Sequence, residues 1–436
     1  MLKAGFARID ITPTLGTTLA GYFYDRPADG ILDPLLATAV VFDNEEKRIA
    51  VVSVDNLGFA QPLMSRVREQ IAQKIETPKE AVFVACTHTH LGPKTLDNLG
   101  HTENEEYIEW MVKKLGDVAF LAAQDLAPAR LLYTRGTVQD VAFVRRYRMK
   151  DGSIKTNPGR LNPNIAGPIG EPDENSSLLI VKREGKPEIG IVNFQVHPDV
   201  IGGCKMSADY PKFVRDTYER NVPNSLCMYM NGAQGDTNHI NVALPKEING
   251  GYQWSAYMGQ KIAMSVISNY RLAQELSGEA ISFGQKNIFV TVNKGRPDQM
   301  EEAKAIYKVY VEEGTEAAAE FSKDKKKVAG YVEAKRIIGL MDMPDEKELY
   351  LTAVSVGDVV FAGFPGEPFT DIGRQVKANS PFTLTIPACC ANGYEGYYPM
   401  SSCFTEGGYE VITARYVSGT AEKIIENSSE LVKSLK

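Results

Sequence analysis

Histidines are rare in this chain, and their placement is the first indication of chemistry. Five occur among 436 residues. His88 and His90 close the run AVFVACTHTH, where an apolar strand pattern leads into a Gly-Pro turn, and His197 ends a second apolar run at a His-Pro pair. Side chains two apart on a strand point to the same side. We therefore predict that His88 and His90 face one pocket at a strand end, where α/β proteins place their sites.

A carboxylate follows a third strand pattern. Glu367 comes directly after the apolar run VVFAGFPG. Two histidines and a carboxylate at separate strand ends form a His₂Glu set, which zinc uses in hydrolytic sites while keeping one position open for water. No pair among these residues has the HExxH spacing. The alternative is that Glu367 is a first-turn acid of the helix predicted by TDIGRQVKAN.

Other polar residues also follow apolar runs. The glycine-rich loop 231–239 could bring backbone N–H groups to an oxyanion, but it lacks the phosphate-loop pattern, which argues against a nucleotide. Arg145 and Arg146 open the stretch 145–172, rich in Pro, Gly and Asn, for which we expect an irregular binding loop. One of these two arginines contacts the substrate or an oxyanion, or both are surface charge. Asp55 either holds a ligand histidine or a water, or is a turn residue.

These residues need strands and helices to position them. Apolar runs predict strands within 48–56, 81–90, 177–198, 225–233, 348–367 and 382–394, with hairpin turns at EGKP and VGD. Helical spacing predicts helices within 62–75, 103–126, 211–222, 254–270 and 413–435. The sequence therefore predicts an α/β fold with a layered mixed β-sheet core flanked by helices.

One segment differs in composition. Residues 297–340 are rich in Glu, Lys and Ala at helical spacing. They predict a charged pair of helices inserted between strands of a single catalytic domain that spans residues 1–436. This helical insertion is either a solvated decoration or a lid over the substrate.

Composition argues against several classes of partner. The net charge of -7 and pI of about 5.5 argue against nucleic acid. No apolar run reaches the roughly 18–20 residues of a membrane span, and no signal-peptide pattern is visible. Six cysteines follow no framework spacing. We expect a cytoplasmic protein without stable membrane association, and the oligomeric state stays open.

Six short motifs, in order, resemble a known family. GFARIDITP with LAGY, then THTHLGP, FQVHP, GAQGD, FPGEP and NGYEGYYP run from about residue 4 to residue 400. This series is similar to that of the neutral/alkaline (non-lysosomal) ceramidases, in their catalytic domain only. The resemblance implies a hydrolase that cleaves an amide with a zinc-activated water and carries one Zn²⁺ per chain.

The resemblance also assigns roles to residues. The zinc ligands that it implies are His88, His197, Glu367 and Tyr397, the last from the pattern NxYxxY. The neighbouring Tyr398 is the alternative match for this tyrosine, which the residue patterns alone do not single out.

By the same resemblance, His90 and Arg145 contact the reacting carbonyl, and Asn238 stands where the family has a serine implicated in catalysis. Asn238 is therefore the third candidate catalytic residue, and a serine nucleophile is not expected.

The substrate that these features imply is a small-molecule amide or ester. The polar stretch 145–172 and the negative net charge favour a water-soluble compound over membrane ceramide. Two alternatives to an N-acyl amidase stay open. One is a hydrolase of small polar esters or lactones on the same zinc site, and the other is a zinc-containing binding protein without activity.

Overall fold

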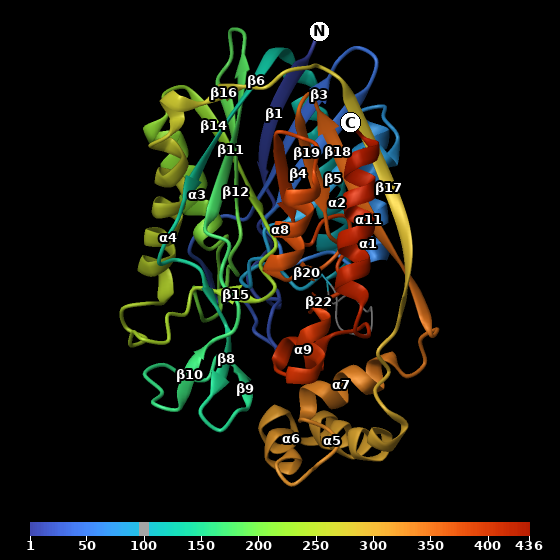
Figure 1. The fold of residues 1–436 in the computed structure, drawn as a ribbon. Coiled ribbons are helices and arrows are strands. Elements are labelled where there is room, and N and C mark those ends of the chain that lie inside the picture. The colour runs from blue at the N-terminus through green and yellow to red at the C-terminus, as the bar shows by residue number, and fades with distance from the viewer. Residues whose placement is uncertain (96–103) are drawn as a thin grey trace.

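Two β-sheets packed face to face form the centre of the fold (Figure 1). The computed structural model describes residues 1–95 and 104–436. Within these ranges, the larger sheet consists in spatial order of β14 (Ser225–Asn231), β12 (Glu188–Phe194), β11 (Asn175–Arg183), β6 (Ala127–Thr137), β1 (Lys3–Asp10), β3 (Leu36–Asp43), β4 (Arg48–Val54) and β5 (Val82–Cys86), with β16 (Gln274–Glu275) beside β6. The smaller sheet consists of β17 (Ile281–Thr291), β18 (Glu346–Val356), β19 (Val359–Gly363) and β21 (Leu384–Ala388).

Helices cover the outer faces of both sheets. These are α1 (Gln61–Lys74), α2 (Glu105–Gln124), α3 (Tyr210–Asn221) and α4 (Gly251–Ile267) on the larger sheet, and α8 (Thr370–Asn379) and α11 (Thr420–Ser434) on the smaller. Each helix buries one apolar stripe, as Leu63, Val67 and Ile71 of α1 do against Val52 and Val84. The predicted α/β class, a mixed sheet core flanked by helices, is confirmed. Among the described residues, no helix has the length and apolar character needed to cross a bilayer.

The predicted strand pairs and helices agree with the structure in most places. β11 pairs antiparallel with β12, and β18 with β19, so both predicted hairpins are confirmed. The predicted start of α2 at Glu103 lies outside the described residues. The C-terminal helix does not run from residue 413, because α10 (Tyr409–Thr413) ends there and Gly419, with φ +95°, precedes α11.

The stretch 145–172 is more regular than we predicted. It forms a three-stranded antiparallel sheet of β8 (Arg146–Met149), β9 (Ile154–Thr156) and β10 (Ile165–Pro168). Backbone pairing holds these short strands, although their side-chain pattern gives no strand signal. The remaining short elements are β2 (Gly30–Ile31), β7 (Phe143–Val144), β13 (Lys205–Met206), β15 (Thr237–Asn238), β20 (Glu367–Pro368), β22 (Tyr397–Tyr398) and α9 (Ser401–Glu406).

The helical insertion lies between β17 and β18, which pair along their whole length. Within residues 297–340, all of them described, α5 (Met300–Glu313), α6 (Thr315–Ser322) and α7 (Tyr331–Leu340) follow a 3₁₀ turn. The prediction of a helical pair is therefore wrong. Gly314, with φ +91°, splits the first predicted helix into α5 and α6. In Figure 1 the insertion lies at the bottom, below α9 and beside the small sheet of β8 to β10.

The larger sheet curls so far that its two edges meet. The Ser53 hydroxyl on β4 donates to the Tyr229 carbonyl on β14, 2.6 Å away. Beyond this contact, the Asn231 side-chain amide at the end of β14 donates to the Thr87 carbonyl after β5, at 3.1 Å. β5 pairs parallel with β4, and β14 pairs parallel with β12. The carboxyl ends of strands from both halves of the sheet therefore come together at one place.

Candidate metal centre and active site

The candidate site lies where the carboxyl ends of strands from both sheets converge. His88 follows β5, His197 follows β12, and Glu367 follows β19. Backbone hydrogen bonds fasten the end of β21 to this place, since Cys389 N donates to Asn231 O at 3.0 Å and Cys86 N donates to Cys390 O at 3.3 Å. Side chains that are 109 and 279 residues downstream of His88 are thereby brought into contact with it.

Three side-chain atoms form a small buried triangle. The Nε2 atoms of His88 and His197 lie 3.3 Å apart. Glu367 Oε2 lies 3.3 Å from His88 Nε2 and 3.2 Å from His197 Nε2. All three side chains are 1–2% exposed. Among the described residues, Glu367 Oε2 has no hydrogen-bond partner of good geometry, which is unusual for a buried oxygen.

The far side of each triangle residue is held by a fixed partner. His88 Nδ1 lies 2.8 Å from Leu57 O, and His197 Nδ1 lies 3.2 Å from Gln234 O. A carbonyl oxygen only accepts, so each Nδ1 carries the proton and each Nε2 directs a lone pair into the triangle. The Tyr394 hydroxyl donates to Glu367 Oε1 at 2.7 Å. Histidines that bind metals are oriented in this way.

Burial and mutual contact set the charges in the triangle. Burial alone raises the pKa of Glu367, but the two imidazoles lower that pKa by more and hold it well below its usual range. Burial, together with the charge of Arg145, lowers the pKa of His197 to about 4. Burial also lowers the pKa of His88, but the Glu367 carboxylate outweighs this effect and the net shift is upward. At neutral pH the centre thus presents an anion and an imidazole lone pair.

His90 is the third imidazole of the site. Its ring centroid lies 5.1 Å from that of His88 and 5.5 Å from that of His197. The ligand atoms of the three histidines lie within 4.8 Å of one another, so this buried group could hold a metal ion. Both ring nitrogens of His90 lack a hydrogen-bond partner among the described residues. Because Glu367 lies closer to the Nε2 pair, His90 borders the triangle, and its Nδ1 lies 3.8 Å from Asp199 Oδ1.

The backbone around His90 and His88 is not a strand. β5 ends at Cys86, and His88 has a left-handed backbone with φ +72°. The prediction that strand alternation places the two rings on one side is therefore wrong, although the rings do meet. The His90 ring packs against Gly21, where a Cβ would lie 2.4 Å from His90 Nδ1. Only glycine fits at this position, in the LAGY motif.

Two tyrosines near the triangle differ in what they contact. Tyr397 pairs with Glu367 through β22 and β20, and its ring lies parallel to that of His197 with centroids 6.4 Å apart. The Tyr398 hydroxyl instead donates to Pro365 O at 2.8 Å, and its ring stacks on Tyr416. The structure therefore brings Tyr397 to the site and turns Tyr398 away from it.

Arg145 lies beside Tyr397. Its guanidinium carbon is 5.1 Å from the centre of the Tyr397 ring. Its Nε donates to Glu410 Oε1 and its Nη2 donates to Gly235 O, both at 2.7 Å. Burial lowers the pKa of Arg145, but its contacts with Tyr397 and Glu410 raise that pKa by more, so the guanidinium stays charged. The alternative of surface charge is excluded, because the side chain is 7% exposed.

Two glycines of the loop 231–239 use their N–H groups within the protein. The N–H of Gly235 donates to Pro368 O at 2.8 Å, and the N–H of Gly232 donates to Phe194 O at 2.8 Å, so neither is free for an oxyanion. A Cβ on Gly235 would lie 2.5 Å from Glu367 O. The expected oxyanion role for these N–H groups is therefore wrong.

Asn238, at the end of this loop, faces the neighbouring sheet. Its Nδ2 donates to Asn157 Oδ1 at 2.8 Å, and its Oδ1 accepts from Ile240 N at 2.9 Å. The side chain is buried, and it connects the metal-centre loop to β9 and the residues that follow it.

Asp55 does not hold a ligand histidine. Its carboxylate forms a buried two-pronged ion pair with Arg215, at 3.0 and 2.7 Å, and accepts from Leu36 N at 3.0 Å. The backbone carbonyls of Leu57 and Gln234 take the role that we expected for Asp55. No sequence signal could identify them, because every residue has a carbonyl.

Comparison with known proteins bears on the fold. No protein-family model matches the chain, and no curated protein matches it. Its α/β architecture does match solved structures over its whole length. Neutral ceramidase from Pseudomonas aeruginosa has a TM-score of 0.74 at 17% identity, covering 100% of this chain and 75% of that one. A ceramidase complexed with C2 has a TM-score of 0.71 at 16% identity, covering 100% and 76%. The chain therefore has the neutral ceramidase fold, as the motif series predicted.

Proposed function

We propose that the chain is a zinc-dependent hydrolase that cleaves the amide bond of small, polar N-acyl compounds. The triangle of His88 Nε2, His197 Nε2 and Glu367 Oε2 carries the proposal. Tetrahedral zinc with bonds of about 2.0–2.1 Å has ligand atoms about 3.3–3.4 Å apart. The separations of 3.2–3.3 Å fit this size. Electron pairs that point at one another in a buried space repel, and a cation bound between these three atoms would offset that repulsion.

The protein's own residues supply the ligands and hold them. His88, His197 and Glu367 would bind zinc, and Tyr397, which adjoins both His197 and Glu367, is our candidate for the fourth ligand. When bound, zinc supplies Lewis acidity that activates water and polarises a carbonyl group. Tyr394 keeps Glu367 in its ligating orientation.

His90 would move the proton. Its two unpartnered ring nitrogens and its place beside the triangle allow it to accept a proton from the attacking water and deliver it to the leaving amine. The charged Arg145, packed on Tyr397, would stabilise negative charge that develops on the carbonyl oxygen. Asn238, which lies in the loop 231–239 and contacts Asn157 after β9, would position the substrate. No serine is required.

Metal content tests this proposal first. Freshly purified protein should contain about one zinc per chain by elemental analysis, and removing it with a chelator should abolish activity that added zinc restores. A protein that binds no zinc, before or after it is supplied, would contradict the proposal.

The substrate is tested separately. Zinc-loaded enzyme should cleave short polar N-acyl amides faster than long-chain ceramide and faster than the matched esters. Preference for the esters would favour an esterase or lactonase on the same centre. Preference for ceramide would contradict the polar substrate and leave the metal centre standing. Zinc content without turnover of any of these compounds would favour a binding protein.

A further inference from the structure

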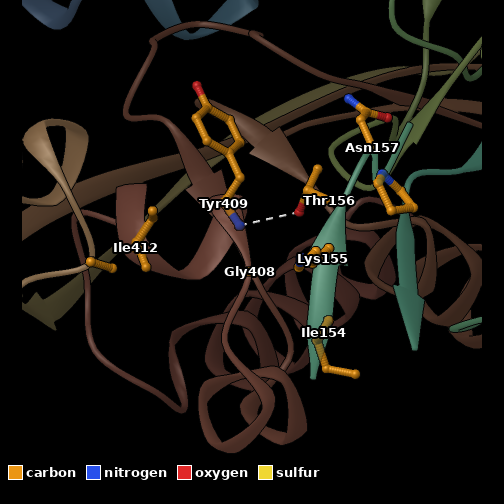
Figure 2. Close-up of a pocket in the computed structure, with 9 residues that line it drawn as sticks. Ile154, Lys155, Thr156, Asn157, Gly408, Tyr409 and Ile412 are labelled. Atoms are coloured by element: carbon orange, nitrogen blue, oxygen red, sulfur yellow. Dashed lines mark hydrogen bonds between the residues drawn. The ribbon is translucent and has the colours of Figure 1, made fainter. Parts of the chain in front are cut away.

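An open surface hollow of about 470 Å³ lies outside the candidate metal centre, between β9, α10 and the helical insertion (Figure 2). We call it the outer pocket. Its lining residues are Ile154, Lys155, Thr156, Asn157, Pro158, Ala329, Gly408, Tyr409 and Ile412. The hydrogen bond from Tyr409 N to Thr156 Oγ1, 3.1 Å long, joins two of its walls. Its volume is in the range of pockets that hold small ligands.

The walls of the outer pocket contact the candidate active-site residues. Asn157 accepts from Asn238 at 2.8 Å. The Tyr409 ring packs edge-on against the Tyr397 ring, with centroids 5.8 Å apart. One wall of the pocket thus shares a residue contact with Asn238 and another with Tyr397.

The wall formed by β9 also reaches Arg145, through one carboxylate. The Thr156 hydroxyl donates to Glu410 Oε2 at 2.7 Å, and Glu410 Oε1 accepts from Arg145 Nε at 2.7 Å. The outer pocket is therefore one side chain away from the residues that would surround the scissile amide.

Charge in the outer pocket is one-sided. Lys155 is the charged side chain of its lining, and no aspartate or glutamate lines it. Among the described residues, Lys155 forms no close ion pair, although its charge helps to lower the pKa of the exposed Asp151 carboxyl. Glu410 pairs with Arg145 and accepts from Thr156. Polar groups of Thr156 and Asn157 accompany Lys155. A long alkyl chain in this space would remove water from the Lys155 ammonium group without replacing its hydrogen bonds, which costs free energy.

We propose that the outer pocket receives the non-reacting end of the substrate, and that Lys155 selects substrates in which this end carries a carboxylate. The apolar side chains of Ile154 and Ile412 would contact a short aliphatic part of the same molecule. Substrates with these features include N-acyl amino acids. Water cleaves their amide bond by giving a hydroxyl to the acyl carbon and a proton to the amine. The cleavage of these substrates rests on the proposed function, whereas their binding in the outer pocket does not.

Binding of ligands that cannot be cleaved tests the outer pocket without relying on turnover. The probes are N-methylsulfonylmethionine and its carboxamide, which differ only in the charged group, titrated calorimetrically into zinc-loaded protein. We expect the carboxylate probe to bind about five-fold more tightly, the size typical of an exposed ion pair. Lys155→Met should remove this preference, and Lys155→Arg should retain it.

Two tryptophan variants test whether the probes bind in the outer pocket. Ala329→Trp adds an indole at the rim of the outer pocket and should weaken both probes by roughly ten-fold, because it fills their space. Ala319→Trp makes the same change at an exposed position of α6 that does not line the pocket and should change neither affinity.

The results separate this inference from the proposed function. Equal binding of the two probes, or a carboxylate preference that survives in Lys155→Met, would overturn the role of Lys155. Normal binding in Ala329→Trp would overturn the location. If the preference depends on Lys155 but the enzyme cleaves neither N-acetylmethionine nor its carboxamide, the pocket stands and the proposed reaction is wrong.

Discussion

The candidate metal centre and the helical insertion are built in opposite ways. The candidate centre joins residues far apart in the chain, and its proposed ligands are buried and fixed by backbone groups, as His88 is by Leu57 O. The insertion folds on neighbours in sequence around a small core of Ala303, Ile306, Val328, Ala334 and Ile337. Most of its ion pairs are exposed and local, such as Lys304 with Glu301 at 3.4 Å, with side chains 54% and 90% exposed. The pair of Arg336 with Glu333 is the buried one, with side chains 7% and 12% exposed.

This difference bears on what each region tolerates. A residue of the centre holds several elements together, so its replacement should have a large and specific effect. A residue of the insertion holds one helix to another, so its replacement should have a small effect that stays in the insertion. The following predictions test this contrast, in order of decreasing effect.

Removal of a ligand should have the largest effect. We expect His88→Ala, His197→Ala and Glu367→Gln each to weaken zinc binding by roughly a thousandfold or more, since loss of even an outer partner of a ligand typically costs about 10–100-fold. Competition against a chromogenic chelator measures this. Asn238→Ala is the control and should bind zinc as the wild type does. Equal zinc affinity in all four variants would mean that the site has been misplaced.

Loss of a buried ion pair should come next. Asp55→Asn leaves Arg215 buried with its carboxylate partner removed, which should lower the free energy of unfolding by about 3–5 kcal/mol. The matched variant in the insertion, Glu301→Gln, should leave that free energy unchanged. Urea denaturation of both proteins makes the comparison. Similar stability of the two variants would remove the contrast between the regions.

The tyrosines near the centre should show a smaller, graded effect on zinc binding. Tyr394→Phe removes the hydroxyl that orients Glu367 and should weaken zinc binding by about 10-fold. Tyr397→Phe should weaken zinc binding less than the loss of an imidazole ligand does. Tyr398→Phe removes a hydroxyl that bonds to Pro365 O and should leave zinc binding unchanged. Unchanged affinity in Tyr397→Phe would exclude a phenol ligand.

The smallest effect is expected in the insertion. The Tyr331 ring stacks on Tyr310 and packs edge-on against Phe23, so it joins the insertion to the loop beside His90. Tyr331→Leu should cost about 1 kcal/mol and appear as faster hydrogen exchange in α5 and α7. Zinc affinity should not change. A loss of zinc in this variant would show that the two regions are coupled.

The sequence predicted those parts of the site that carry their own signal. His88, His197 and Glu367 each end a run of buried apolar residues, and a strand pattern with a polar residue at its end is visible in one segment alone. Leu57 and Gln234 act through their carbonyls, which leave no trace in the sequence. The pairing of Asp55 with Arg215 spans 160 residues, and its geometry depends on the curl of the larger sheet.

The fold shows the same difference between elements that carry a local sequence signal and elements that do not. Strands with continuous apolar runs, such as β5 and β12, were predicted, because burial on both faces selects apolar residues. β17 was missed since Gln285, Lys286 and Asn287 interrupt its pattern, and β18 pairs with it regardless. The small sheet of β8 to β10 was missed for a related reason: only Tyr147 and Met149 of β8 are buried apolar residues, and charged arginines alternate with them.

The left-handed backbone of His88 has a consequence for how this protein can evolve. A residue with a Cβ at φ +72° costs the folded state about 1–2 kcal/mol relative to glycine. Selection for stability alone would therefore favour glycine at this position, and it would remove the imidazole. A histidine at this position sets the proposed metal binding against stability at a single residue. Attempts to stabilise this protein by consensus or computational redesign should leave position 88 untouched.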